Sequence, residues 1–333
     1  MTRRRLAVVV AVSGATLLAA AAVALVVGSG PDGHLVLLDL RRALGENGQE
    51  AQIFFLSRLP RAVAAAIAGA GLAAAGATYQ AILRNPLAEP YTLGVSSGAA
   101  LGAVLAIRLG LEAVVGTAAV PLLAFAGSLA AIGLIWRLAA VGTARPPATL
   151  LLAGLTLAFV CSAATMLVLY TASFSESYRI IRWLMGGLDW IPTVDLVRSG
   201  VVVAFGLGAL LYIARDLNAL AAGADAAASV GVPVNRSVGI GFVAASLTVG
   251  AVIAFSGPIG FVGIIVPHIL RGLWGPDHRA LLPACILSGA AFVLLSDTVA
   301  RTLLAPQQIP VGVLTALLGG PFFFSLLRAR RLR

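Results

Sequence analysis

Few side chains in this 333-residue sequence could do chemistry, and none stands in the pattern of an enzyme's active site. The P-loop motif, the metalloprotease motif HExxH and the redox motif CxxC are all absent. The three histidines are not spaced with one another, or with a cysteine, as metal ligands usually are. Cys161 and Cys285 lie in apolar runs, where a thiol behaves as a small buried hydrophobic group. The sequence therefore predicts no catalytic residue, no metal site and no bound cofactor.

Acidic residues are nearly absent from the apolar segments, and Asp297 is the clearest case. Arg301 follows Asp297 by one helical turn, so a structural ion pair between them is the first interpretation, with a transport role as the alternative. Proton-driven carriers use carboxylates or histidines at membrane depth as relays, and the middles of these segments lack them. A carrier driven by an ion gradient is therefore the weaker alternative. A membrane-embedded enzyme would need a cluster of His, Asp or Cys at one depth, and none is visible.

The composition indicates that water is not the main solvent of this chain. Apolar residues make up 60% of the sequence and charged residues 11%, against roughly 25% charged residues in a soluble domain. The mean hydropathy is +1.00. A helix needs roughly 20 apolar residues to cross a hydrocarbon core of about 30 Å. The sequence predicts an all-α integral membrane protein of about ten transmembrane helices, folded as one polytopic domain over residues 1–333. The expected spans are residues 6–27, 62–83, 91–109, 113–136, 149–171, 194–214, 237–255, 259–270, 280–304 and 310–327.

The arginines predict how the chain is oriented. All 23 basic residues are Arg, and seven of them cluster at the two ends of the chain, three at the start and four at the end. An excess of arginine beside a span marks the cytoplasmic side, so both termini are expected in the cytoplasm and the number of spans should be even. Basic residues bind nucleic acid when they form one solvated patch, and these do not, so no nucleic-acid partner is expected. The terminal clusters are Arg3, Arg4 and Arg5 before the first span and Arg328, Arg330, Arg331 and Arg333 after the last.

The first apolar run, residues 6–27, has a second interpretation. An Arg-rich flank followed by apolar residues is also typical of a signal peptide. The run is longer than the roughly 7–15 apolar residues usual for a signal peptide, which favours a membrane span. Within the later spans, small residues recur at four-residue spacing, as in Gly69, Ala73 and Ala77, and this spacing predicts close helix packing.

Three polar stretches lie between the expected spans. Residues 31–57 and 172–192 mix apolar side chains with charges as interfacial helices do, and we expect both at the outer surface. Residues 215–236 form an Ala-rich stretch that is helical in propensity until Gly231 and Pro233 stop it. This would be the longest cytoplasmic loop, and we expect it to dock a partner. The eighth span follows Gly257 and Pro258 directly, so its backbone is expected to be irregular.

Longer motifs in the same order carry a family resemblance over about residues 55–327. Taken together they resemble the permeases of ABC importers for iron-siderophores, haem and cobalamin. The motifs are RLPR at residues 58–61, QAILRNPLAEP at 80–90, LGVSSGAALGA at 93–103, LLLAG at 150–154, WLMGGL at 183–188, GPIGFVGIIVPHILR at 257–271, DHRALLPACILSGA at 277–290, DTVAR at 297–301 and IPVGVLTALLGGPFF at 309–323.

The resemblance implies a transmembrane permease subunit that moves a bulky iron chelate, a siderophore or haem, into the cytoplasm. Cobalamin is the alternative cargo. It also implies a lipid-embedded homodimer with a second permease copy, two cytoplasmic ABC ATPase subunits, and a periplasmic or lipid-anchored substrate-binding protein. ATP and Mg²⁺ would bind to the ATPase, and this chain would hold no cofactor. The location implied is the cell inner (cytoplasmic) membrane, crossed several times.

The resemblance further implies roles for residues at both ends of the spans. Arg58, Arg61 and Arg301 match outer arginines that receive acidic residues of the binding protein through charge-assisted pairs. The alternative is that Arg58 and Arg61 anchor a helix at the lipid headgroups. On the cytoplasmic side, Asn85, Pro86 and Leu87 match the turn of the family's gate, with a merely structural turn as the alternative.

Residues 215–236 match the helix that couples these permeases to their ATPases. Small side chains in such a helix would let it seat in a groove of the ATPase. The family often has a Glu pair and an Arg where this chain has Ala224, Asp225 and Ala228, so the choice of ATPase partner is expected to differ. The matching positions are Leu217, Ala219, Leu220, Gly223, Ala226, Ala227 and Gly231.

Overall fold

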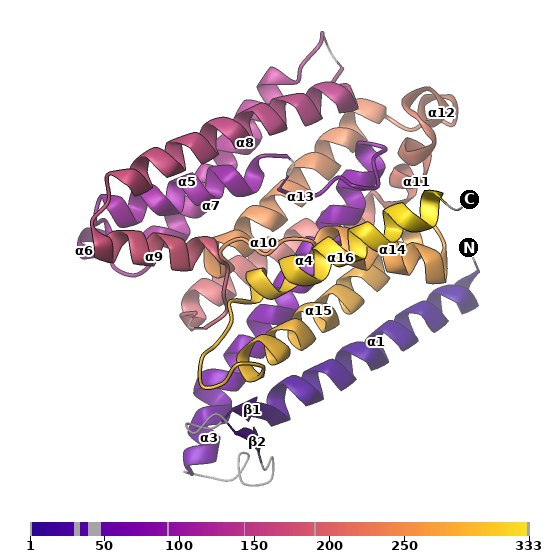
Figure 1. Cartoon of the computed structure of the whole chain (residues 1–333). Helices are drawn as coiled ribbons and strands as arrows, with labels where there is room; N and C mark the ends of the chain where they lie inside the picture. Colours follow the sequence, from indigo (N-terminus) through magenta and orange to yellow (C-terminus); the bar gives the residue numbers. More distant parts are fainter. Residues whose placement is uncertain are drawn as a thin grey trace.

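The computed structural model describes residues 2–29, 34–38, 48–91, 93–142, 144–189 and 191–331, and helices dominate them (Figure 1). The principal helices are α1 (Arg3–Val26), α4 (Leu59–Ile82), α5 (Val95–Arg108), α7 (Ala119–Leu138), α8 (Pro147–Tyr170), α10 (Thr193–Tyr212), α13 (Val234–Ser256), α14 (Val262–Trp274), α15 (His278–Thr302) and α16 (Val311–Arg331). Shorter elements lie between them: β1 (Val27–Ser29), β2 (Leu35–Leu37), α3 (Gln49–Ile53), the π-helical turn η1 (Phe54–Arg58), α6 (Glu112–Val115), α9 (Phe174–Leu184), α11 (Ala214–Ala222) and α12 (Ala224–Ser229).

Each segment expected as a span contains one principal helix. In the described part of the chain, seven helices are long and apolar enough to cross a membrane, and α5, α14 and α16 are apolar but offer fewer than 18 such residues. The structure therefore confirms a mostly helical, membrane-type fold, whereas the count of ten spans stays a prediction. The largest error in the expected boundaries is at α7, which begins at Ala119 rather than at residue 113, because the short helix α6 and a turn occupy the preceding residues. The helix α5 begins at Val95 rather than at residue 91, and α14 begins at Val262 rather than at residue 259.

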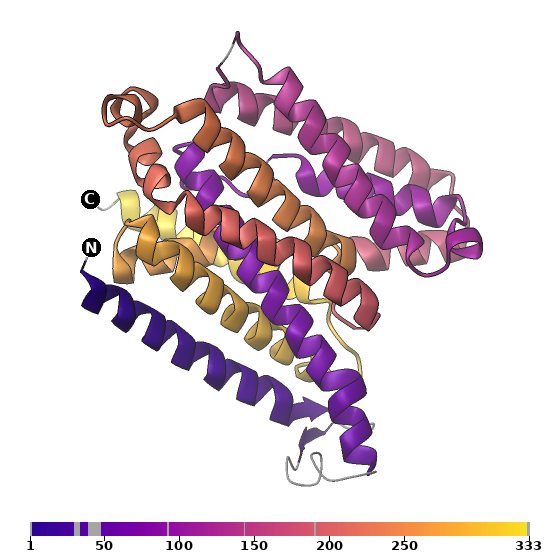
Figure 2. The same cartoon turned by 180° about the vertical axis from the view of Figure 1, so that it is seen from behind.

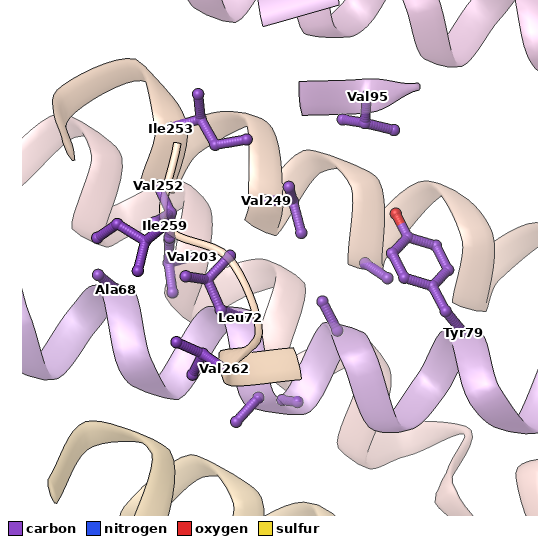
Figure 3. Packing of buried hydrophobic residues seen from close by; sticks show 14 of the residues in the cluster. Ala68, Leu72, Tyr79, Val95, Val203, Val249, Val252, Ile253, Ile259 and Val262 are labelled. Atoms are coloured by element: carbon purple, nitrogen blue, oxygen red, sulfur yellow. The ribbon is translucent and has the colours of Figure 1, made fainter. Parts of the chain in front are cut away.

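Helix α4 lies at the centre of the bundle and packs against α15, α13, α14 and α10. Most of its residues are Ala or Gly, and almost all residues after Val63 are buried in the chain's own core. Leu72 and Tyr79 of α4 lie in one apolar cluster with Val203 of α10 and Val249 of α13 (Figure 3). The buried Tyr79 hydroxyl is satisfied by a hydrogen bond of 2.6 Å to the Ser246 hydroxyl. The centre of the bundle is therefore built from small side chains with few polar groups.

Glycines let α4 touch its neighbours backbone to backbone. A Cβ atom at Gly69 would overlap the carbonyl oxygen of Gly289 in α15, and a Cβ atom at Gly76 would overlap the carbonyl oxygen of Gly263 in α14. The Cβ of Ala73 fills the space where a side chain at Gly289 would lie. The close packing that the four-residue spacing of small residues predicts is therefore present.

The two ends of the bundle carry different elements. The start of α1, the end of α16, α11 and α12 lie at one end, and the β hairpin, α6 and α9 lie at the opposite end (Figures 1 and 2). We call these the α11–α12 end and the α9 end. Both ends of the chain thus lie at the same end of the bundle, which agrees with an even number of crossings.

At the α9 end, helix α4 begins earlier than expected. α3 and η1 lead into it, so one helical stretch extends from Glu50 to Ile82. The prediction of an interfacial helix over residues 31–57 was wrong for the described residues. There β1 pairs with β2 in an antiparallel hairpin, and residues 49–58 extend α4. Residues 30–33 and 39–47 lie outside the described residues. The second interfacial helix is confirmed as a helix, α9, which Ser173 and Glu176 cap reciprocally.

Between α13 and α14 the backbone is irregular, as Gly257 and Pro258 predict. Residues 257–260 are not helical, and Gly257 has a φ of 64°. The stretch after α9 lies against this segment, because the amide of Gly187 donates to the carbonyl oxygen of Ser256 at 2.8 Å. The start of α16 joins them, since the amide of Gly312 donates to the carbonyl oxygen of Gly186 at 3.1 Å. The irregular backbone is therefore hydrogen-bonded inside the protein, as a membrane location requires.

The contact between α4 and α15 predicts the effect of one added methyl group. Gly69→Ala should lower the unfolding free energy by about 1–3 kcal/mol, because the new Cβ forces the two backbones apart. Gly208→Ala in α10 is the matched control, because a Cβ there meets no atom within 4 Å. Thermal unfolding of the purified protein in detergent measures both variants. Equal midpoints for the two variants would contradict the close contact of α4 with α15.

Candidate functional sites at the two ends of the bundle

Arg61 is the centre of an ion-pair network at the α9 end. Its guanidinium pairs with the carboxylate of Asp297 through two hydrogen bonds of 2.9 Å, Nε to Oδ2 and Nη2 to Oδ1. It also lies 3.3 Å from Oδ1 of Asp189 and donates to Oε1 of Gln308 at 2.7 Å. The other oxygen of Asp189 pairs with Arg182 of α9 at 2.7 Å. The network therefore ties α4 to α15, to the stretch after α9 and to the loop before α16.

The prediction that Asp297 forms an ion pair with Arg301 was wrong. Within the described residues no ion pair joins these two side chains, and Arg61 from a distant part of the sequence takes the carboxylate. A one-turn spacing made Arg301 the obvious partner, but its guanidinium points to α1 and donates to the carbonyl oxygen of Ala24. Sequence spacing could not reveal that α4 brings a second arginine to the same carboxylate.

Arg58 and Arg301 hold the end of α1. Arg58 donates to the carbonyl oxygens of Leu25 and Val26, and both arginines are almost fully buried, with 7% and 8% of their surface exposed. The last carbonyl groups of a helix lack partners within it, and these guanidinium groups supply them. All three arginines predicted to dock a binding protein therefore have partners within the chain. Their docking role is untested and stays a prediction.

The turn expected at the gate is present at the end of α4. The Asn85 side chain holds it, because Oδ1 accepts a hydrogen bond of 3.0 Å from the amide of Leu87. Arg84, the residue before it, has a left-handed backbone with a φ of 49°. Pro86 and Leu87 are exposed at the tip of the turn. The turn is therefore ordered, and its role as a gate stays a prediction.

Glu89 has a position that the sequence did not indicate. The expected topology counts it among the charges of the cytoplasmic loops, but its Oε2 accepts a hydrogen bond of 3.3 Å from the amide of Phe261, directly before α14. Phe261 has a left-handed backbone with a φ of 66°. The loop after α4 therefore contacts the irregular segment before α14, a contact between residues 172 positions apart.

The docking element expected over residues 215–236 forms two helices rather than one. Gly223 separates α11 from α12 and has a φ of 129°, a conformation that L side chains rarely adopt. The sequence correctly indicated helix in the Ala-rich stretch and a stop near Gly231. It did not indicate the break at Gly223, because a single Gly within a helical pattern is often tolerated.

The matching positions divide into a buried set and an exposed set. Leu217, Leu220, Gly223 and Ala227 are buried in the subunit itself, Ala219 is partly buried, and Ala226 and Gly231 are exposed. A partner can touch only the exposed set without unfolding the element. We define the α12 surface as its exposed residues Ala224, Asp225, Ala226, Ala228, Ser229 and Val230.

A hydrogen-bonded cluster anchors this element to α15. Asn218 of α11 donates to Oδ1 of Asp277 at 2.8 Å and accepts from the amide of His278 at 2.7 Å. Asp277 caps the start of α15 and pairs with Arg279, which holds the pKa of Asp277 well below its usual range. Sequence reasoning missed Asn218, although a lone Asn in an Ala-rich stretch was a signal. These hydrogen bonds therefore fix α11 to the start of α15.

One short motif resembles the nucleophile motif of hydrolases but lacks the structural surroundings that this motif requires. Residues 94–98 read GVSSG and match the GxSxG pattern of hydrolase nucleophiles, so the expectation that the sequence contains no such motif was wrong. That pattern requires a strand before the serine and an exposed hydroxyl. Here a loop precedes Gly94, and Ser96 is 2% exposed within α5. Ser96 therefore lacks the geometry of a nucleophile.

The helical membrane fold and the comparisons with known proteins together define a multi-pass permease of the ABC importer class. More narrowly, the chain belongs to the FecCD transport family, whose model matches residues 16–329. The cobalamin import system permease protein BtuC of Halobacterium salinarum is 44% identical over 276 residues, which is 83% of this chain and 73% of that protein. The vitamin B12 import system permease protein BtuC of Escherichia coli is 41% identical over 280 residues, 82% of this chain and 83% of that protein.

A solved structure supports the same class. It is described as an inward-facing conformation of a transporter assigned to the metal-chelate type of ABC transporters. It matches with a TM-score of 0.83 at 31% identity and covers 97% of this chain and 99% of its own. The family resemblance inferred from the sequence is therefore confirmed.

The Arg61 network predicts a large loss of stability on truncation. In Arg61→Met the carboxylate of Asp297 is left buried without its partner, since the side chains of this pair are only 9% and 5% exposed. The expected loss is about 3–5 kcal/mol of unfolding free energy. The control Arg182→Met removes an exposed ion pair with Asp189 and should cost about 0–1 kcal/mol.

Thermal unfolding in detergent measures both losses. The double variant Arg61→Met with Asp297→Asn removes the buried charge and should regain part of the stability lost in Arg61→Met alone. A double variant less stable than Arg61→Met would contradict a direct pairing of Arg61 with Asp297.

Proposed function

We propose that this ABC importer permease moves cobalamin or a closely related corrinoid into the cytoplasm. The observation that carries the proposal is that two relatives, each aligned over more than four fifths of this chain, are named as permeases for cobalamin and vitamin B12. The iron chelate expected from the sequence rested only on its frequency as a cargo of the family. No residue motif for either cargo exists, because a bulky chelate would pass along small and apolar side chains.

An iron chelate, as siderophore or haem, is the second candidate. The solved structure of the metal-chelate type favours it, because its chain aligns with nearly the whole of this one. The sequence identity of that protein is 31%, against 44% and 41% for the two cobalamin permeases. This difference favours the corrinoid.

We further propose ten spans in the cell inner (cytoplasmic) membrane, with both termini and the α11–α12 end in the cytoplasm. The arginine clusters at both termini support this orientation, because positive charge favours the cytoplasmic side. The protein would act as a homodimer with two ATPase subunits at the α11–α12 end and a substrate-binding protein at the α9 end. ATP and Mg²⁺ would bind to the ATPase subunits, and this chain would hold no cofactor.

The geometry suggests how the parts would work together. The ATPase would contact the α12 surface. The buried residues Leu217, Leu220 and Ala227 would keep α11 and α12 in place when the ATPase moves against them. The motion would pass through Asn218 to Asp277 and α15, and from there through the contact of Gly289 with Gly69 to α4. The turn at residues 85–87 follows directly from α4, so it would move with this helix.

At the α9 end, Arg58, Arg61 and Arg301 stay our proposal for docking the binding protein. Their buried positions add a condition, because an acidic residue of the binding protein must compete with partners already in place. For Arg61 these partners are Asp297 and Asp189, and of the two Asp189 is the easier to displace, because it is more exposed and keeps its ion pair with Arg182. Docking and the arrangement of α4, α15 and the stretch after α9 would then be coupled.

Uptake into proteoliposomes tests the proposed cargo and the energy source. The permease with its co-purified ATPase and binding protein should take up cobalamin only when ATP is supplied on the ATPase side. Ferric siderophore and haem are measured in parallel, each with its own binding protein. If ATP drives uptake of an iron chelate but not of cobalamin, the cargo is the iron chelate and the corrinoid proposal is rejected. Uptake that follows a proton or sodium gradient without ATP would reject the importer mechanism.

The α12 surface predicts which alanine contacts the ATPase. Ala226→Phe should reduce co-purification of the ATPase at least about tenfold, because a large side chain blocks close approach at an interface. The fold should survive, because Ala226 is exposed. Ala113→Phe, on an exposed position of α6 at the opposite end, is the control and should leave assembly unchanged. Normal assembly of Ala226→Phe would remove α12 from the interface.

A further inference from the structure

A cavity of about 590 Å³ lies at the α11–α12 end, between the end of α4, α11 and the α14–α15 connection. Its lining includes Asn218, Asp277 and His278 of the anchoring cluster, but the roles described so far do not use its arginines. The polar residues that line it come from four elements of the fold and the turns next to them. They are Gln80, Arg84, Asn218, Arg271, Asp277 and His278.

The cavity carries positive charge that the chain does not neutralise. Within the described residues, Arg84 and Arg271 make no hydrogen bond or ion pair. Asp277 is the acidic residue of the lining, and Arg279 already holds both of its oxygens, through Nε at 3.0 Å to Oδ1 and Nη2 at 2.7 Å to Oδ2. Asn218 donates to the same carboxylate at 2.8 Å. Two guanidinium groups therefore face a cavity without a counter-ion from the described chain.

The backbone fixes where Arg84 can reach. Its left-handed φ of 49° at the end of α4 sets the direction of the side chain. Its Nη1 lies 3.7 Å from the position that a Cβ at Gly223 would occupy, so the guanidinium lies beside the junction of α11 and α12. The cavity is thus adjacent to the α12 surface, where the ATPase is proposed to bind.

A buried acceptor in the same cavity lacks a donor. Gln80 is 4% exposed, and its Nε2 donates to the carbonyl oxygen of Gly263 at 2.9 Å, which fixes the orientation of the amide. Its Oε1 has no hydrogen-bond partner among the described residues. A buried polar atom without a partner costs about 1–3 kcal/mol, so this oxygen favours a ligand that brings an N–H or O–H group.

We propose that this cavity receives an acidic side chain of the ATPase subunit, with its carboxylate between Arg84 and Arg271 and an N–H of the same segment at Oε1 of Gln80. A peptide segment supplies both the anion and the donor that the lining requires. Arginine pairs with carboxylates through its fixed fork of N–H groups, which suits a cavity that two guanidinium groups line. The inference rests on the proposed function, because it requires an ATPase at the α11–α12 end.

The absence of lysine from the sequence makes a specific test possible. In Arg84→Lys and Arg271→Lys the positive charge is kept, and each variant contains a single side-chain amine. A water-soluble carbodiimide joins an amine to a carboxylate only when they are in contact. Treatment of the assembled permease and ATPase should therefore link either lysine to an Asp or Glu of the ATPase, which mass spectrometry of the joined peptides identifies. Arg137→Lys, an exposed position on α7, is the control and should give at least tenfold less product.

Three other results would overturn the proposal. One is a complex that assembles normally but yields no joined peptide at residues 84 or 271. Another is a product joined only to Asp277 within the same chain. The third concerns inorganic phosphate: the isolated permease binds it, and Arg84→Gln and Arg271→Gln lose this binding while their affinity for the ATPase is unchanged. That result would assign the cavity to a free anion. If the unmodified permease captures no ATPase at all, the proposed function fails instead, and the two failures are thus distinguished.

Discussion

The structure depends on the direct contact of backbones along α4. A membrane removes the hydrophobic gain of helix association, so helices there adhere through close packing and polar contacts. Ala and Gly in α4 let α13, α14 and α15 approach without long side chains between them. At Gly69 and Gly76 the fit leaves no space for a methyl group. One central helix therefore fixes the positions of its neighbours, and a displacement of α4 must displace them as well.

Because α4 crosses the whole bundle, it brings polar groups to both ends. Arg61 lies near its start, in the ion-pair network, and Gln80 lies near its end, in the arginine-lined cavity. The interior between them has few polar side chains, and several of them are satisfied locally, as in the hydrogen bond between Tyr79 and Ser246. The polar chemistry of the protein is therefore confined to its two ends, with a closely packed apolar bundle between them.

The two ends use their charges in different ways. At the α9 end the carboxylates Asp297 and Asp189 pair with Arg61 and Arg182, and Arg58 and Arg301 donate to backbone carbonyl oxygens, so each of these arginines has a partner within the subunit. At the α11–α12 end Arg84 and Arg271 lack a carboxylate within the described chain. Arginines with partners hold elements together, whereas guanidinium groups without a carboxylate favour an anion from outside. This difference supports our proposal that a binding protein exchanges contacts at the α9 end and an ATPase binds at the α11–α12 end.

The sequence by itself determined the helical membrane class, the approximate place of each principal helix, the family and the presence of helix in residues 215–229. These follow from apolar length, from arginines at the ends and from motifs in a fixed order, all of which are local properties of the chain. Only the tertiary structure decided which side chains meet. It paired Asp297 with Arg61 rather than Arg301, and it placed the carboxylate of Glu89 at the amide of Phe261. It left Ala226 exposed and buried its neighbour Ala227. It also brought Gln80, Arg84 and Arg271 into one cavity. The physical reason is that these contacts join residues far apart in the sequence, and their geometry depends on how closely the helices approach, which no local pattern records.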